Sequence, residues 1–436
     1  MGRDGLKFIN CPKTDHSINM RKTNKTKNPS GVFDAIVVGA GPAGAECARE
    51  LSIMGRKVLL MERSQRIGEP NFSSAVTPAE MIKDFGLPLG VARDVWSKIL
   101  VQANDYPCLW DHKETKGYIL DFRELKKFLV KDALGHGVRV MVGTSAESPI
   151  IEKGVVCGVK YGGIYGDGEV RARVVVDASG PVGVLASKLG LRKSRPCAPG
   201  VGIESIIEDK VVVKSLKKSR GVISFYLGDD YVPHGYGWIF PFGREALKVG
   251  CCVYRAADRG IAKPDYSDMM AIFQRFLGKF PEFKDLQITE LHGGDIFVAD
   301  GMKRNCRDGF LVIGDAAFQI NPLGGEGIRH GLHSGRMAAE VINKAVLRND
   351  FSKKGLAEYD KNWRAYIGMK WDLSLKISKR VYAGFNDGQW KDIMGFASLL
   401  SPEECFQVLF HYNYFRAIKF GRLAKLAKTI KTVVFK

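Results

Sequence analysis

A glycine-rich turn between a short apolar run and a helical segment constrains the fold of this chain more than any other feature. The turn reads Gly39-Ala40-Gly41-Pro42-Ala43-Gly44 and follows the apolar run 33–38. A segment with helical character, 45–54, comes next and ends at Gly55. A second apolar run, 57–61, leads directly into Glu62. The order strand, glycine turn, helix, strand and acid predicts a βαβ unit of the kind that binds a dinucleotide.

Each residue type in this unit has a physical purpose. The first glycine allows the tight turn, the second lets the backbone approach a pyrophosphate, and the third lets the helix pack closely on the strand. The helix N-terminus offers unpaired N–H groups and a partial positive charge to the phosphates. An acid at the end of the second strand can bind the ribose hydroxyls of the adenosine. An ordinary glycine turn without a nucleotide is the alternative interpretation. We expect the cofactor to contact Gly39, Gly41, Pro42, Ala43, Gly44, Glu62 and Arg63.

A second motif, about 275 residues later, indicates which dinucleotide is bound. Gly314-Asp315 follows the strand-like run 309–313, and a glycine-rich turn leads from Asn321 into a long helical segment, 327–347. An Asp after a buried strand can bind a ribityl hydroxyl, and the N-terminus of the following helix can stabilise negative charge on a reduced flavin. The alternative is a strand, turn and helix with Asp315 as a helix cap. The pair of motifs favours FAD, with contacts from Gly314, Asp315, Pro322, Gly324, Gly325, Gly327 and Ile328.

Charge is concentrated at the two ends of the 436-residue chain, whose formal net charge is +19. Residues 1–31 hold seven basic and two acidic residues, and residues 416–436 hold seven basic residues and no acid. The first segment is polar and is expected to be disordered. In the second, cations recur about every third residue between apolar ones, which predicts a basic amphipathic helix on a membrane surface. A solvated terminal helix is the alternative. No nucleic-acid-binding module is recognisable, so no nucleic-acid partner is expected.

Cysteine usage and hydropathy limit the compartment and the chemistry. The nine cysteines are scattered and form no Cys-x-x-Cys pair, which favours a reducing, intracellular compartment and excludes zinc or iron–sulfur spacing, so we expect no metal. No apolar run reaches the roughly 18–20 residues that span a bilayer. A cytoplasmic protein associated peripherally with the membrane is therefore predicted.

The motifs together resemble the superfamily of p-hydroxybenzoate hydroxylase-like flavoproteins, and within it the geranylgeranyl reductase family. The matching segments are 39–44, 62–63, 123–129, 177–180 and 314–328. The resemblance implies a cofactor contact from Arg123, on the amphipathic segment 122–134. It also places Asp177 and Gly180 near the adenosine and pyrophosphate. From the residues alone, an arginine on an amphipathic helix such as Arg123 is more often a solvated or paired surface charge.

The resemblance implies an α/β fold with a Rossmann-like FAD-binding domain, an inserted antiparallel β-rich substrate domain and a helical C-terminal region. We expect the FAD-binding domain to be discontinuous, with part of the substrate region at about 65–115. The expected units are a basic tail (1–31), the FAD-binding domain (32–185 and 296–348), the substrate domain (186–295), the helical region (349–415) and the basic helix (416–436).

An aromatic run supplies the candidate substrate site. In a strand, Tyr236, Trp238 and Phe240 would lie on one face and form a flat apolar wall. Packing in an ordinary core is the alternative. The family resemblance implies that this run, with Pro241 and the later Gly250, lines the cavity for a prenyl chain beside the flavin.

The resemblance also implies the reaction, which is hydride transfer from reduced FAD to an isolated C=C bond of a prenyl lipid. Many family members carry a cysteine that is proposed to assist catalysis, and Ser73 stands at that position here. A hydroxyl is a poorer acid than a thiol, so Ser73 is a candidate catalytic residue or an ordinary loop hydroxyl. No second glycine fingerprint is present, so electrons would come from NAD(P)H or a ferredoxin-like carrier. The alternatives are a monooxygenase or halogenase using NAD(P)H and O₂, a flavin-dependent cyclase, and a flavin-binding protein without activity.

Overall fold

The structure of the chain is a computed structural model. It describes residues 31–71, 73–164, 166–192, 198–209, 220–254, 266–284, 288, 290–298, 301–382 and 384–414. The basic segments predicted at the two ends lie outside the described residues, apart from Gly31.

The first of two large sheets has the glycine-turn strand at its centre. Its order is β17 (Cys306–Arg307), β18 (Phe310–Val312), β11 (Gly168–Asp177), β1 (Phe33–Val38), β2 (Val58–Met61) and β8 (Arg139–Met141). The pairs from β18 to β8 are parallel, and β17 is antiparallel to β18. The parts of β1, β2, β11 and β18 that pair with one another at the centre are apolar, as in residues 35–38, 58–61, 174–176 and 310–312, because both faces of a parallel sheet are covered.

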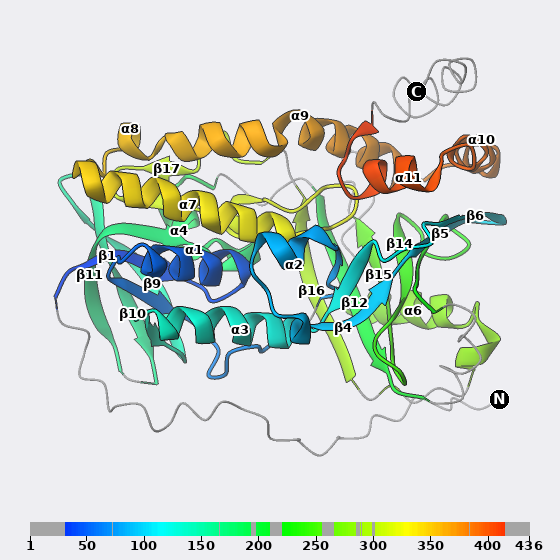
Figure 1. Cartoon of the computed structure of the whole chain (residues 1–436), viewed down its shortest axis with the longest axis horizontal. Helices are drawn as coiled ribbons and strands as arrows, with labels where there is room; N and C mark the ends of the chain where they lie inside the picture. Colours follow the sequence, from blue (N-terminus) through cyan, green and yellow to red (C-terminus); the bar gives the residue numbers. More distant parts are fainter. Residues whose placement is uncertain are drawn as a thin grey trace.

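Different elements cover the two faces of this sheet. Ala35 and Val37 of β1 pack with the helices α1 (Pro42–Ile53), α3 (Phe122–Gly135) and α7 (Ile328–Arg348). Ile36 and Val38, which alternate with them, pack with β10 (Val155–Gly163), β11 and α4 (Val184–Lys188). β9 (Thr144–Glu152) pairs with β10, which in turn pairs antiparallel with the first part of β11. These layers are visible around β1 and β11 in Figure 1.

The second large sheet is antiparallel apart from one pair. Its order is β16 (Glu290–Val298), β12 (Ala198–Ile207), β15 (Leu247–Tyr254), β14 (Gly235–Pro241), β13 (Val222–Leu227), β5 (Lys98–Ala103) and β6 (Tyr106–Asp111). β13 and β5 run parallel. Strands β5 and β6 come from the region at about 65–115 and complete a sheet whose other members lie more than 80 residues later. A small third sheet, β3 (Val76–Pro78), β7 (Gly117–Leu120) and β4 (Ala92–Trp96), leads into and out of this excursion.

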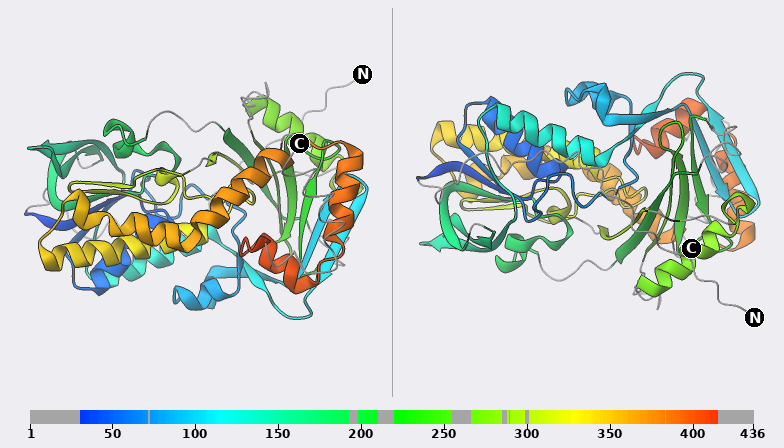
Figure 2. Two further views of the ribbon diagram at one scale, coloured as in Figure 1. Left: turned by 90° about the horizontal axis from the view of Figure 1, so that it is seen from above. Right: turned by 90° about the horizontal axis from the view of Figure 1, so that it is seen from below.

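The second sheet is also covered on both faces. Phe273 and Phe276 of α6 (Tyr266–Leu277) pack against one face. Side chains of α9 (Glu358–Val381), α10 (Asp387–Ala397) and α11 (Pro402–Leu409) pack against the other. Figure 2 shows these C-terminal helices and α6 on opposite sides of the strands. The expected α/β class with a parallel sheet and a helical C-terminal region is therefore confirmed.

Helix α9 connects the two halves of the molecule. Tyr359, near its start, is buried in the core of the first sheet, and Leu375, near its end, is buried in the core under the second sheet. Two short helices, α2 (Glu80–Asp84) and α8 (Lys353–Leu356), are the remaining α-helices among the described residues. None of the described helices is both long and apolar enough to cross a bilayer.

Candidate active site

The three glycines of the first motif occupy three different environments. Gly39 has φ +103°, and a Cβ there would lie 2.3 Å from the carbonyl oxygen of Ala178. A Cβ at Gly44 would lie 2.0 Å from the carbonyl oxygen of Gly39, so α1 could not pack as closely with any larger residue. Around Gly41 nothing lies within 4 Å of the Cβ position. The space that Gly41 leaves open belongs to a cavity.

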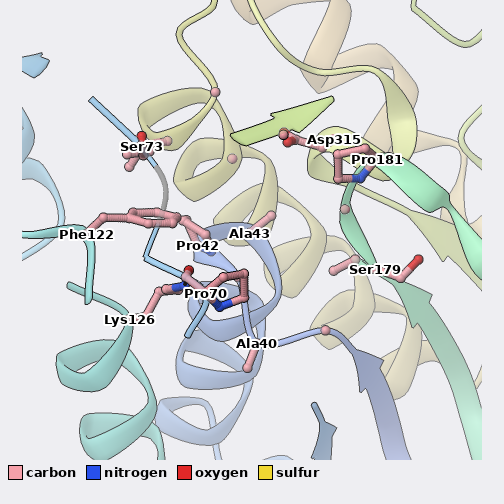
Figure 3. A pocket seen from close by; sticks show the side chains of 18 of the residues that line it. Ala40, Pro42, Ala43, Pro70, Ser73, Phe122, Lys126, Ser179, Pro181 and Asp315 are labelled. Atoms are coloured by element: carbon pink, nitrogen blue, oxygen red, sulfur yellow. Dashed lines mark hydrogen bonds between the residues drawn. The ribbon is translucent and has the colours of Figure 1, made fainter. Parts of the chain in front are cut away.

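We call this cavity, about 470 Å³ in volume, the cofactor cavity, because most of the residues that the sequence predicts to contact the cofactor line it. Figure 3 shows Pro42 and Ala43 at the start of α1 between two walls, with Phe122 and Lys126 of α3 on one side and Ser179, Pro181 and Asp315 on the other. The structure brings most of the predicted contacts together. The predicted residues that line it are Gly39, Gly41, Pro42, Ala43, Glu62, Arg63, Gly180, Asp315, Gly324, Gly325, Gly327 and Ile328, with Ser73, Tyr236 and Trp238.

Glu62 is held in place by backbone donors at one end of this cavity. One carboxylate oxygen accepts a hydrogen bond from the backbone N–H of Ala40 at 2.8 Å, and the other accepts from Ser64 N–H at 2.8 Å. The carboxylate thus joins the glycine turn to the end of β2. It stands where an acid would bind ribose hydroxyls.

The second motif forms the opposite part of the cavity. The Asn321 side chain accepts from the backbone N–H groups of Leu323 and Gly324, at 2.8 and 2.9 Å, and so closes the turn that leads into α7. Burial raises the pKa of Asp315 to about 6, opposed by the charge of Arg192. Asp315 therefore carries a charge at neutral pH at a cost in stability, as residues shaped for a ligand do. The motif residues Gly314 and Pro322 lie behind the cavity wall, and a Cβ at Gly314 would lie 2.7 Å from Ala43 Cβ.

Asp177 also lies behind the wall. It is fully buried and its carboxylate accepts hydrogen bonds from the N–H groups of Ser179, Leu185 and Ala186 and from Ser179 Oγ. These bonds fix the loop after β11, whose residues 178–181 line the cavity. The structure thus assigns Asp177 to holding the loop, and Gly180 to the cavity itself.

Helix α3 faces the cavity with Lys126 and not with the predicted Arg123. A Cβ at Gly68 would lie 2.7 Å from Arg123 Cγ, which places Arg123 behind that glycine, and its Nη2 lies 3.7 Å from Glu290. Lys126 and Phe122, one turn apart, both line the cavity, and Lys126 Nζ donates to the carbonyl of Pro70 at 2.8 Å. Burial lowers the pKa of Lys126 to about 8. The i, i+4 spacing of Phe122 and Lys126 is the sequence signal that would have identified this face.

A second cavity of about 550 Å³ adjoins the first and is almost entirely apolar; we call it the apolar cavity. The predicted aromatic residues Tyr236, Trp238 and Phe240 form one wall, with Phe225 of β13 beside them. The facing wall comes from the C-terminal helices, which the sequence analysis did not connect to the site. Its helical residues include Leu373, Ile377, Val381, Trp390, Ile393, Met394, Ala397 and Leu409.

The two cavities meet at one place. Eight residues line both, namely Ser73, Ser74, Tyr236, Trp238, Gly324, Gly325, Gly327 and Ile328. Tyr236 donates from its hydroxyl to the carbonyl of Gly324 at 3.1 Å. The glycine-rich turn 321–327 of the second motif, which we call the flavin turn after the predicted cofactor, is therefore tied directly to the aromatic wall. We call this place the junction.

Three further predicted residues have distinct positions. Ser73 lines both cavities, and its Oγ accepts from the N–H of Ala75 at 3.2 Å. Gly250 lies behind the wall, opposite Trp238 in the β14–β15 pair, and a Cβ there would lie 2.4 Å from Trp238 Cζ2. Gly250 thus shapes the site by giving the indole room. Pro241 ends β14, beyond the part of that strand that lines the cavities.

Comparison with known proteins identifies the class. The family profile described as FAD dependent oxidoreductase matches residues 34–192, and that described as geranylgeranyl reductase catalytic domain matches residues 205–296. The first range holds the glycine turn and Glu62, and the second holds β13, β14 and β15 and most of β16. The chain is an FAD-dependent oxidoreductase, and its cofactor is FAD.

Relatives and solved structures narrow the class. Digeranylgeranylglycerophospholipid reductase of Methanoculleus marisnigri is 31% identical over 340 residues, covering 76% of this chain and 82% of the relative. The protein of the same name from Haloferax volcanii is 30% identical and covers 92% of this chain and 98% of the relative. A geranylgeranyl bacteriochlorophyll reductase-like protein of Thermoplasma acidophilum superposes with a TM-score of 0.71 at 22% identity, covering 92% and 96% of the two chains. The chain belongs to the geranylgeranyl reductase family.

The same fold occurs in enzymes of other chemistry. A flavin-dependent brominase, Bmp2, superposes with a TM-score of 0.65 at 18% identity, covering 88% of this chain and all of the brominase chain. At that identity the likeness concerns the fold alone. The residues around the junction must therefore decide between reactions.

Proposed function

We propose that this enzyme saturates C=C bonds in the geranylgeranyl or other prenyl chains of membrane lipids. The observation that carries the proposal is the apolar cavity, which opens onto the flavin turn at the junction and is walled by aromatic and aliphatic side chains. A cavity of this composition binds a hydrocarbon chain by excluding water. The relatives' names point to the same substrate class.

The cofactor residues fit FAD on the structure's own terms. Gly41 leaves the cavity open beside the N–H groups of α1, Glu62 stands at one end, and Asp315 and the 321–327 turn stand further along. Bound FAD, once reduced, supplies a hydride. Among the remaining predicted contacts, Gly44, Asp177 and Gly314 support these residues from behind, and we assign Arg63 to the adenosine end.

The chain's own residues must hold the alkene and keep water away. An isolated double bond is hard to polarise, so the rate depends on holding it in a near-attack position. We assign this to Tyr236 and Trp238, which line both cavities, and assign Phe240 to the chain beyond the junction. Ser73 also lines both cavities, and we propose that its Oγ passes a proton from water to the second alkene carbon.

The substrate's location implies how the enzyme works in the cell. We propose that it acts at the surface of the cytoplasmic membrane leaflet, held by the basic residues of 416–436. We propose NAD(P)H or a ferredoxin-like carrier as the electron donor. A flotation assay with anionic and neutral vesicles, using the full chain and a chain ending at 414, tests the membrane contact.

Lipid mass spectrometry tests the reaction. Purified enzyme with FAD and dithionite, without oxygen, is expected to add the mass of two hydrogen atoms per double bond to geranylgeranyl lipids. A product of unchanged mass would indicate a cyclase, and turnover that requires O₂ would indicate a monooxygenase or halogenase. FAD binding with no turnover of any lipid would contradict the proposal.

A further inference from the structure

Three residues on three neighbouring strands explain how the Trp238 indole is held. Glu204 of β12 and Trp238 of β14 both pair with Gly250 of β15, so the three lie side by side across the sheet. Because Gly250 has no side chain, the indole lies over it, and Trp238 Nε1 donates to Glu204 Oε2 at 2.9 Å. Glu204 is 5% exposed and lines the cofactor cavity. A bond across a whole strand thus sets the plane of a ring that lines both cavities.

A buried lysine lies beside this acid. Lys248 is two residues before Gly250 on β15, is 1% exposed, and has its Nζ 4.0 Å from Glu204 Oε1. The same Nζ donates to the carbonyl of Ser73 at 2.6 Å and lies 4.6 Å from the Phe242 ring centroid. Burying an unpaired charge at this depth would cost a large free energy, and the opposite charge of each partner lowers that cost for the other.

The pair therefore reaches both sides of the junction. Glu204 holds Trp238 on the sheet side, and Lys248 holds the backbone of the Ser73–Ser74 segment on the other. A structural ion pair is more often found at the protein surface, where it contributes little. The cost of burying this one suggests that the position it maintains matters to the enzyme.

We propose that Glu204 and Lys248 are positioning residues for alkene reduction, and that they also set the electrostatic field at the flavin end of the cofactor cavity. This inference rests on the proposed function for its effect on alkene reduction. The effect on the cofactor requires only that FAD binds. Neither residue is needed as a proton donor.

The test compares Glu204→Gln, Lys248→Met and the double variant. Removing the acid is expected to shift the midpoint potential of bound FAD to more positive values, because a negative charge that repels the reduced flavin is gone. Removing the lysine is expected to shift the potential to more negative values, because a positive charge that attracts the reduced flavin is gone. Each single variant should reduce prenyl lipid about tenfold more slowly in a single turnover, and the double variant should recover part of that loss because no charge is left unpaired.

Glu46→Gln provides the matched control. Glu46 is a fully buried acid that pairs with Arg336 at 2.8 Å, and it lies in α1 away from both cavities. Whatever its effect on thermal stability, its replacement should leave the flavin potential and the single-turnover rate unchanged. If the Glu204 and Lys248 variants behave like this control, the inference is wrong.

Two further outcomes are separable. If the single variants fail to hold FAD, the double variant carries the test. Its two opposite potential shifts should largely cancel, so the rate decides, and a wild-type single-turnover rate in the double variant would overturn the inference. If the wild-type enzyme reduces no prenyl lipid but the opposite potential shifts appear, the proposed function fails and the electrostatic part of the inference stands.

Discussion

The cofactor cavity and the apolar cavity are built in different ways, although they share eight residues. The first is formed mainly by backbone, from glycine turns and helix N-termini, together with the two acids Glu62 and Asp315. The second depends on side chains from β5, β13, β14 and three C-terminal helices that are far apart in the chain. The first therefore tolerates few replacements at any position, whereas the second should tolerate many replacements that keep its shape.

The largest expected effect comes from the backbone-built cavity. In Gly44→Ala the new Cβ would meet the carbonyl oxygen of Gly39 at 2.0 Å, which the backbone must move to relieve. The free energy of unfolding of the FAD-free protein should fall by about 3 kcal/mol. Chemical denaturation measures this change.

Gly41→Ala is its control, because nothing lies within 4 Å of that Cβ. The FAD-free stability should stay within about 1 kcal/mol of wild type, while the affinity for FAD falls. Equal destabilisation by both substitutions would contradict the different roles assigned to the two glycines.

The next largest effect should come from filling the apolar cavity. Ala397→Trp, on α10, places a large ring in the cavity at a distance from the flavin motifs. We expect KM for geranylgeranyl lipids to rise about 10- to 100-fold, since a few lost methylene contacts account for that much. The absorbance spectrum and affinity of bound FAD should not change. A loss of FAD would show that the two cavities are not separable.

The buried charge of Asp315 in the cofactor cavity should lower the stability of the FAD-free protein. Its folded-state pKa of about 6 lies above the ordinary value near 3.9, so the folded protein binds more protons than the unfolded chain between about pH 4 and pH 6. The free energy of unfolding that protonated Asp315 contributes is therefore lost as the pH rises through that window. Asp315→Asn should stabilise the FAD-free protein at pH 7 by about 1–2 kcal/mol and remove this pH dependence. FAD affinity should fall at the same time, and a stabilised variant with unchanged affinity would contradict a role in binding.

The smallest effect is expected at the junction. Ser73→Ala should slow the single-turnover rate about three- to tenfold, and Ser73→Cys should retain or exceed the wild-type rate, because a thiol is the better acid. Stopped-flow oxidation of the reduced flavin by prenyl lipid measures both. If Ser73→Ala has the wild-type rate, Ser73 is an ordinary loop residue.

The contrast between the cavities also explains what the sequence could predict. The βαβ unit, the helices 122–135 and 328–348 and the FAD motifs follow from local rules of turn and helix formation, and the structure has them within a few residues. Lys126 was not identified from the sequence, because a lysine on an amphipathic helix usually faces solvent and nothing in the local pattern marks this one as buried. Asp177 was predicted to lie near the adenosine and pyrophosphate. In the structure its carboxylate accepts hydrogen bonds from backbone N–H groups after β11 and so holds the loop that lines the cavity.

The apolar cavity could not be predicted as a cavity. Ile377, Val381 and Met394 have the spacing of residues in any core, and only the tertiary structure shows that they face a space and not one another. Glu204 and Lys248 lie on two strands more than 40 residues apart, so their pairing depends on the sheet register.

The central claim is that an apolar cavity presents a prenyl double bond to reduced FAD. Anaerobic single turnover with a geranylgeranyl lipid measures it most directly, with flavin absorbance and product mass recorded on the same sample. The account predicts that flavin oxidation and the gain of two hydrogen atoms per turnover occur together, and that Ala397→Trp slows both. Flavin that stays reduced in the presence of the lipid, or oxidation without a gain in product mass, would contradict the claim.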